Sequence, residues 1–163
     1  MKLHIFNTEG LILLMNIIID ENSNLNQGSS GLITGEIYFE QNNYYFPEKR
    51  WSDFPVIVLG WWISSFLEFV KQNSGTFEFC FMDGPFKIVG VVIQEEMIEI
   101  YSCSQYEDVN KKDFLGYMNK NEIQNMLLKA SRKLFKVIAL SDISDNKLDG
   151  LKKLFFQLKE LEL

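Results

Sequence analysis

Histidine and cysteine, the residues behind most nucleophilic and zinc chemistry, are scarce in this chain. Its one histidine, His4, lies in an apolar, strand-like segment near the start of the 163-residue sequence. Histidine is the commonest general base near neutral pH, and a structural zinc site takes four ligands, mostly cysteine or histidine, at set spacings. The two cysteines, Cys80 and Cys103, stand alone in apolar, strand-like runs. We therefore expect no histidine-dependent nucleophile, no conventional zinc site and two reduced thiols.

Carboxylates supply the other chemistry that this composition allows. Glu95, Glu96 and Glu99 lie close together around a predicted turn. Two carboxylates a few ångströms apart are enough for glycosidase-type hydrolysis. Acids at turns and strand ends are more often solvated, and we favour that interpretation while the sequence leaves a carboxylate site open.

Two ligand-binding motifs can be tested directly against the sequence. Residues 145–150 have the acidic and glycine spacing that begins a calcium loop, but Lys147 stands at a ligand position and Phe156 at that of the bidentate glutamate. We reject calcium binding here and expect Asp145 to cap the final helix. The glycine-rich loops that cradle phosphates are absent from the sequence. We expect no cofactor.

The acidic charge balance restricts the class of partner. The formal net charge is −6 at pH 7, whereas a nucleic-acid-binding domain normally presents a basic face. A basic stripe at helical spacing is formed by Lys129, Arg132, Lys133 and Lys136. It lies opposite the apolar face of its own helix, so we interpret it as solvated. We predict no nucleic-acid binding, and a basic protein partner suits the charge.

No segment has the pattern of a signal peptide or a membrane anchor. Leu11–Ile19 is short, is interrupted by Asn16 and has neither a basic segment before it nor a cleavage site after it. Phe54–Val70 contains Gly60 and Glu68 and falls short of a bilayer span. We therefore predict a cytoplasmic protein with no membrane partner.

The order of the patterns predicts one α+β domain over residues 1–163. We expect a mainly antiparallel sheet of about six strands, with three helices packed mostly on one face. Strand patterns cover Leu3–Phe6, Leu11–Ile19, Gly31–Gln41 (with a bulge expected at Gly35), Tyr44–Phe46, Thr76–Met82, Phe86–Ile93, Met97–Ser104 and Asp113–Met118. Helical patterns run from a cap at Ser52 or Asp53 to about Gln72, from a cap at Asn119 or Asn121 to about Ile138, and from about Leu148 to Leu161.

Two details of these patterns have consequences for the surface. Phe86–Ile93 is apolar at both odd and even positions, which is typical of a central strand covered on both faces. Gln105–Lys112 is rich in charge, and we interpret it as a loop.

The first helix carries a tryptophan on its polar side. Trp61 lies opposite the core face, with Ile57 and Phe54 one and two turns before it, so the helix has a second, narrower apolar stripe. Another element, such as a C-terminal helix or the segment Tyr44–Phe46, covers this stripe in one interpretation. In the other, the stripe anchors a partner, because tryptophan is enriched at interface hot spots. Self-association is the most economical form of the second interpretation.

The connection before this helix is a second candidate surface. It mixes Tyr44, Tyr45, Phe46 and Trp51 with charged residues, as recognition loops do. The alternative is that these aromatic rings fill the edge of the sheet. The candidate partner-binding residues are Trp61, Ile57, Tyr44, Tyr45 and Trp51.

Three runs of aromatic and turn residues resemble small bacterial proteins of uncharacterised families, some of which are linked to polymorphic-toxin systems as immunity proteins. The runs are Phe46-Pro47-x-x-x-Trp51-x-Asp53-Phe54, Leu59-x-Trp61-Trp62 and Phe81-Met82-Asp83-Gly84-Pro85-Phe86. The resemblance covers about residues 33–103. It implies a compact α+β inhibitor that binds a toxin domain and performs no chemistry. No binding residue carries over, because immunity proteins vary most at the surfaces they use.

Three hypotheses about function follow. The leading one is a non-enzymatic protein-binding domain, in its specific form an immunity-type inhibitor of a basic toxin domain. The first alternative is a small enzyme or ligand-binding domain with a carboxylate-lined pocket. The second is a structural homo-oligomer, with a homodimer as its simplest form.

Overall fold

The computed structural model of the chain describes residues 14–21, 25–94, 97–106 and 109–163. The elements, in chain order, are β1 (Asn16–Ile18), β2 (Asn26–Gln27), β3 (Ile33–Glu36), β4 (Tyr38–Gln41), β5 (Tyr44–Phe46), β6 (Ser52–Asp53), α1 (Pro55–Gln72), β7 (Thr76–Cys80), β8 (Phe86–Gln94), β9 (Met97–Tyr106), β10 (Val109–Met118), α2 (Lys120–Ala139) and α3 (Leu148–Lys159). The predicted strand Leu3–Phe6 and the start of Leu11–Ile19 lie outside the described residues.

The strands form three antiparallel sheets, which confirms the α+β class. The largest is the meander β10-β9-β8-β7, and the two smaller sheets have the orders β1-β4-β5 and β2-β3-β6. The described residues contain ten strands, so the prediction of about six was too low. The predicted strand Gly31–Gln41 divides at Ile37, whose N–H donates to the Trp51 carbonyl as the chain passes from one small sheet to the other.

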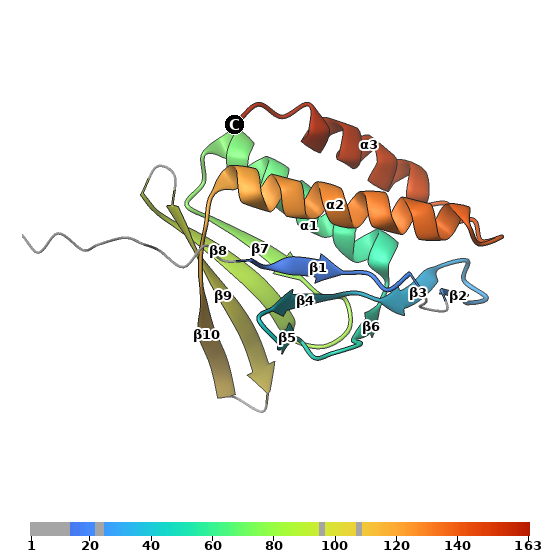
Figure 1. Cartoon of the computed structure of the whole chain (residues 1–163), viewed down its shortest axis with the longest axis horizontal. Helices are drawn as coiled ribbons and strands as arrows, with labels where there is room; N and C mark the ends of the chain where they lie inside the picture. The colour runs from blue at the N-terminus through green and yellow to red at the C-terminus, as the bar shows by residue number, and fades with distance from the viewer. Residues whose placement is uncertain (1–13, 22–24, 95–96, 107–108) are drawn as a thin grey trace, which may run out of the picture.

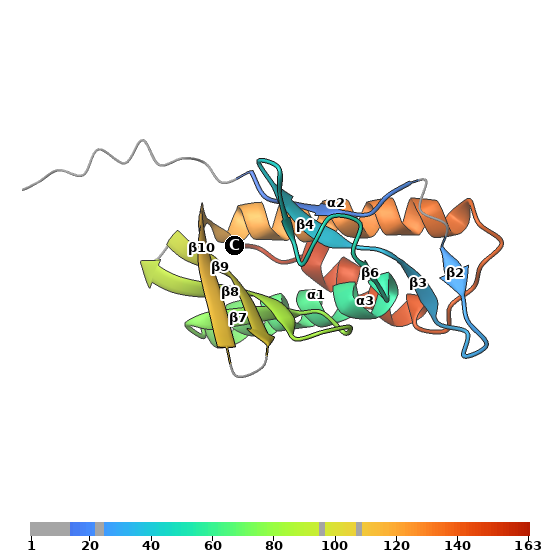
Figure 2. The ribbon, with the colours of Figure 1, turned by 90° about the horizontal axis from the view of Figure 1, so that it is seen from below.

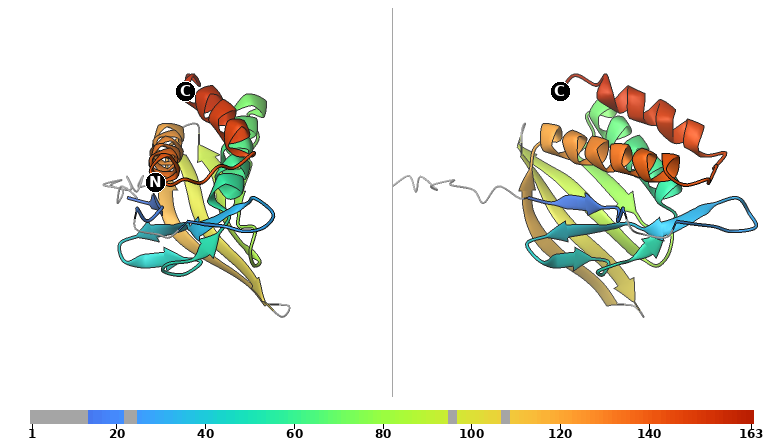
Figure 3. Two further views of the ribbon diagram at one scale, coloured as in Figure 1. Left: turned by 90° about the vertical axis from the view of Figure 1, so that its right-hand side faces the viewer. Right: turned by 45° about the vertical axis from the view of Figure 1, so that its right-hand side comes forward.

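The three predicted helices are present and lie together on one side of the strands (Figure 1; Figure 3). From below, the strands stand in front of them (Figure 2). α1 packs on α3, α2 and the inner face of β7. No helix in the described part of the chain combines the length and the apolar character needed to cross a membrane.

The core is centred on aromatic rings where α1 meets β4 and β7. Trp62, at 0% exposure, lies 4.8 Å from the Phe39 ring and 5.9 Å from the Phe79 ring, centroid to centroid. Phe77 and Phe79 alternate with outward-facing residues along β7, as the strand period predicts. Each such ring pair adds about 0.5–1.5 kcal/mol beyond the area that it buries.

The helix ends show which predicted caps form. Asn119 and Glu122 make a reciprocal capping box at α2, with bonds of 2.9 and 2.8 Å. The prediction that Asp145 caps α3 was wrong, because the N-cap of α3 is Lys147. The Asp145 carboxylate instead accepts a hydrogen bond from the N–H of Lys147, before the helix begins.

The cap expected at Ser52 or Asp53 was also wrong, because α1 begins after Phe54 without a side-chain cap bond. Asp53 instead forms a buried junction, with 2% of its surface exposed. Its Oδ1 accepts from the Phe54 N–H at 2.8 Å, and its Oδ2 accepts from the N–H groups of Met82 and Asp83 at 3.0 and 3.1 Å. The indole of Trp51 also donates to Oδ2, at 3.5 Å. One carboxylate thus ties the start of α1 to the turn between β7 and β8.

We predict that Asp53→Ala lowers the free energy of unfolding by about 2–3 kcal/mol, because hydrogen bonds to a charged acceptor are lost and three backbone donors lose their partner. Urea unfolding measures this change. Ser52→Ala is the matched control on the same strand, is exposed, and is expected to change stability by less than about 0.5 kcal/mol. Equal unfolding midpoints for the two variants would contradict the role of Asp53.

Candidate functional site

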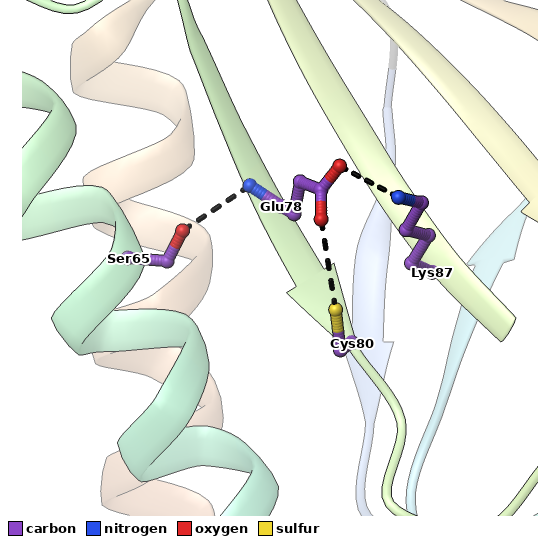
Figure 4. Close-up of polar contacts among 4 residues, drawn as sticks. All are labelled: Ser65, Glu78, Cys80 and Lys87. Atoms are coloured by element: carbon purple, nitrogen blue, oxygen red, sulfur yellow. Dashed lines mark hydrogen bonds and ion pairs between the residues drawn. The ribbon is translucent and has the colours of Figure 1, made fainter. Parts of the chain in front are cut away.

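β7 is the edge strand of the meander, and side chains occupy its outer edge. The Glu78 N–H donates to the Ser65 hydroxyl of α1 at 3.1 Å (Figure 4). The Trp62 indole donates to the Cys80 carbonyl at 2.7 Å, and the Ser74 hydroxyl donates to the Thr76 carbonyl at 3.2 Å. An unpaired edge recruits further strands. These bonds therefore block strand addition along β7.

The same contacts locate Trp61. It lies one turn before Ser65 on α1, and one turn of helix and two residues of strand each span about 6 Å. Since α1 runs antiparallel to β7 at these contacts, Trp61 is level with Cys80. Its side chain is 47% exposed, and Ile57 is half-buried one turn earlier. We call Phe54, Ile57 and Trp61 the Trp61 stripe.

In one interpretation of the sequence, a C-terminal helix or the segment Tyr44–Phe46 covers the Trp61 stripe. Both elements make their contacts elsewhere. α3 approaches at Gly60, where a Cβ would lie 3.8 Å from Cδ1 of Leu154. Tyr44–Phe46 pairs with β4 and contacts the meander through Phe46 and Tyr44. Trp61 is left half-exposed.

The second candidate surface is mostly occupied by internal contacts. Tyr44 is 40% exposed, but its hydroxyl is 3.0 Å from the hydroxyl of the buried Ser102 on β9. Tyr45 is half-buried against the Tyr38 ring. Trp51 is half-buried, with its ring 5.2 Å from that of Phe86 and its indole N–H directed at Asp53. Tyr44 contacts β9, two strands away from β7, whereas Trp51 reaches only the start of the Trp61 stripe, through the Asp53 carboxylate that also binds the Phe54 N–H.

A third surface was missed from the sequence: the face of the meander that points away from the helices. We call it the outer face. Across the strands β7 to β10 it carries, row by row, Thr76, Val91, Glu99 and Tyr117; then Glu78, Val89, Tyr101 and Phe114; then Cys80, Lys87, Cys103 and Lys112.

The prediction that β8 is covered on both faces was wrong. Val89 and Val91 are only half-buried on the outer face, and Phe114 and Tyr117 are 50% and 41% exposed. Within the predicted loop at 105–112, residues 105–106 belong to β9 and residues 109–112 to β10, and the two segments pair with each other or with β9, so the described part of that prediction was wrong. Phe114 is exposed between the half-buried Asp113 and Leu115, and the ladder is interrupted by a bulge between Phe114 and Gly116, so the sequence around it shows no regular alternation.

Polar side chains on the outer face are engaged with one another. Lys87 Nζ lies 2.6 Å from Glu78 Oε1, and the other oxygen of Glu78 is 4.0 Å from Cys80 Sγ (Figure 4). The Tyr101 hydroxyl donates to Glu99 at 2.6 Å, which raises the pKa of that hydroxyl. The Lys112 ammonium lies 3.9 Å from the centroid of the Tyr101 ring.

The two cysteines lie on the outer face in positions that prevent a bridge. Both are free, and Lys87 stands between them on the intervening strand. Two strand spacings separate their Cα atoms by roughly 10 Å, beyond disulfide reach. Burial is the main cause that raises the pKa of both thiols, so they are protonated at neutral pH and weakly nucleophilic.

Of the three predicted acids Glu95, Glu96 and Glu99, the structure describes Glu99. An open pocket of about 510 Å³ at one end of the outer face is lined by Lys87, Lys111 and Lys112, together with both thiols, and by no described acid. Glu99 is bonded to Tyr101 instead. Glu95, Glu96 and His4 lie outside the described residues, within which no group of three potential metal ligands occurs.

Comparison with protein-family models, with curated proteins and with solved structures found no match to this chain.

We predict that the Cys80 thiol reacts with iodoacetamide only above the pH range of an ordinary cysteine. Lys87 lowers the Cys80 pKa and Glu78 raises it, so Lys87→Met should shift the reaction profile to still higher pH, and Glu78→Gln should shift it to lower pH. Alkylation rates of a Cys103→Ser background, followed against pH by mass spectrometry, measure these shifts. Rapid alkylation at pH 7 in that background would contradict the inert thiol.

Proposed function

We propose that this chain is a non-enzymatic protein-binding domain whose partner docks on the Trp61 stripe. The observation that carries the proposal is the half-exposed Trp61 ring, 47% exposed on a helix whose neighbouring residue Trp62 is completely buried. Burying a large aromatic ring at an interface contributes strongly to affinity, and such rings dominate binding hot spots.

The packing of α1 supports a rigid anchor. Trp62, Ile63 and Phe66 are buried in the core on the side of the helix opposite Trp61. Two hydrogen bonds, from the Glu78 N–H to Ser65 and from the Trp62 indole to the Cys80 carbonyl, hold the helix against β7. A side chain on a fixed helix loses little conformational freedom on binding, which favours affinity. Exposed Ser64 provides a polar rim beside the ring.

The same bonds define the mode of recognition. Partners that add a strand to a sheet use main-chain hydrogen bonds at an unpaired edge. The edge of β7 beside Trp61 already has its Glu78 donor and its Cys80 acceptor occupied. Recognition at this position therefore relies on side chains.

The specific form that we propose is an immunity-type inhibitor of a basic toxin domain. Two observations support it: the resemblance of the aromatic and turn runs described above, and the net charge of −6. Opposite net charges speed the encounter between an inhibitor and its target, and the gain falls with ionic strength.

We predict that Trp61→Ala weakens partner binding by about 30-fold, the loss of roughly 2 kcal/mol expected at a hot spot. The measurement is recovery of the partner from lysate of the source cells on immobilised protein, followed by titration. Phe156→Ala is the matched control, since Phe156 is an exposed ring, 57%, on α3. Equal recovery by wild type and Trp61→Ala, with equal unfolding midpoints, would refute the proposal.

The immunity form makes a separate prediction about the genome. The coding sequence directly upstream should encode a large secreted protein with a variable C-terminal domain. Expressed alone, that domain should arrest growth, and coexpression of this chain should restore it. Growth arrest that coexpression does not relieve would refute the immunity hypothesis. The broader protein-binding proposal would then be tested by Trp61→Ala alone.

A further inference from the structure

The outer face of the meander has the composition of an interface and not of a solvated sheet. Its centre is an apolar and aromatic band made of Val89, Val91, Tyr101, Phe114 and Tyr117. Antiparallel sheets that face water on one side commonly alternate apolar and polar residues, which leaves the exposed face polar. Here the residues that alternate outward are largely apolar.

The charges of this face are balanced and separated along the strands. Lys87 and Lys112 lie in one row, Glu99 lies two rows away, and Glu78 lies between them, bonded to Lys87. Two lysines and two glutamates sum to zero, in a chain whose net charge is −6. A neutral outer face therefore adds no net repulsion of its own when two copies of this acidic chain meet there.

We propose that the outer face is a homodimer interface, on which a second copy of this chain packs sheet against sheet. A two-fold interface brings the same patch together from both copies, so the patch must complement itself. A two-fold axis in the plane of the interface, running across the strands, reverses the strand direction of one copy. That operation brings the Lys112 end of one face over the Glu99 end of the other, and it places the two Phe114 rings near the axis.

The size of the face suits a modest, concentration-dependent dimer. β8 has nine residues and β9 and β10 have ten each. With about 3.3 Å per residue and about 4.8 Å between strands, the face measures roughly 500 Å² in each copy, or about 1,000 Å² in all. Specific interfaces begin at about that area, and the weaker ones lie at this end of the range.

The interface proposal is independent of the Trp61 stripe. Trp61 lies beside β7, whereas the most exposed rings of the outer face, Phe114 and Tyr117, lie on β10 at the opposite side of the meander. A variant can therefore remove one surface and preserve the other.

Sedimentation velocity tests the dimer. Protein concentrations between about 1 and 200 µM suit an interface at the weak end of the specific range. Wild type should shift from monomer to dimer, and Phe114→Glu should weaken the dimer at least 10-fold because each copy places a carboxylate at the apolar centre. Phe156→Glu is the matched control, with a similarly exposed ring on α3. Trp61→Ala should dimerise as wild type does. A wild type that stays monomeric, or a Phe114→Glu variant that dimerises normally, overturns the inference.

A second measurement needs no substitution on β10. In a Cys80→Ser variant the remaining thiol is Cys103, on the outer face. Its alkylation rate, at a fixed excess of reagent, should fall several-fold as the protein concentration rises through the dimer range, because the second copy covers it. A rate that is independent of protein concentration contradicts the interface.

Discussion

The backbone groups on the free edge of β7 must find partners, and the way they do so determines where α1 lies. The Glu78 N–H bonds to Ser65 and the Cys80 carbonyl bonds to Trp62, so the helix is fixed to the strand at two points one turn apart. Buried Asp53 adds a third point, because it joins the start of α1 to the turn after β7. With the helix held in this register, the core face of α1 meets the aromatic rings of β4 and β7, and Trp61 is directed outward.

The surfaces available for recognition follow from this arrangement. Because all three helices lie on one side of the strands, the outer face of the meander keeps its rings exposed. Strand addition along β7 is blocked, and on β10 the bulge after Phe114 and the bond from Gln41 to the Leu115 carbonyl disturb the other edge. Both proposed interactions therefore rely on side chains: the proposed partner protein would use the Trp61 stripe, and the proposed second copy would use the outer face. Neither surface contains converging acids or an activated thiol in the described structure.

The parts of the fold that local pattern determines could be predicted from the sequence. The period of α1, its proline in the first turn and the asparagine cap of α2 predicted both helices to within a few residues. Strands of two residues carry no period, so β2 and β6 were missed. The charged start of β10 was missed as well, whereas its second half was predicted as the strand Asp113–Met118. The roles of Asp53 and Ser65 depend on partners 29 and 13 residues away, and the exposure of Trp61 depends on where α3 packs. Such contacts leave no local signal.

Amide hydrogen exchange of the free protein, resolved by residue, tests the closed edge most directly. On an unpaired edge strand the outward N–H of Glu78 would exchange as fast as that of an exposed loop. We predict that the Glu78 N–H exchanges as slowly as the inward N–H groups of Phe77 and Phe79, and that Ser65→Ala accelerates exchange at Glu78 alone. Fast exchange at Glu78 in the wild type would show that α1 does not close the edge, and the placement of Trp61 would lose its basis.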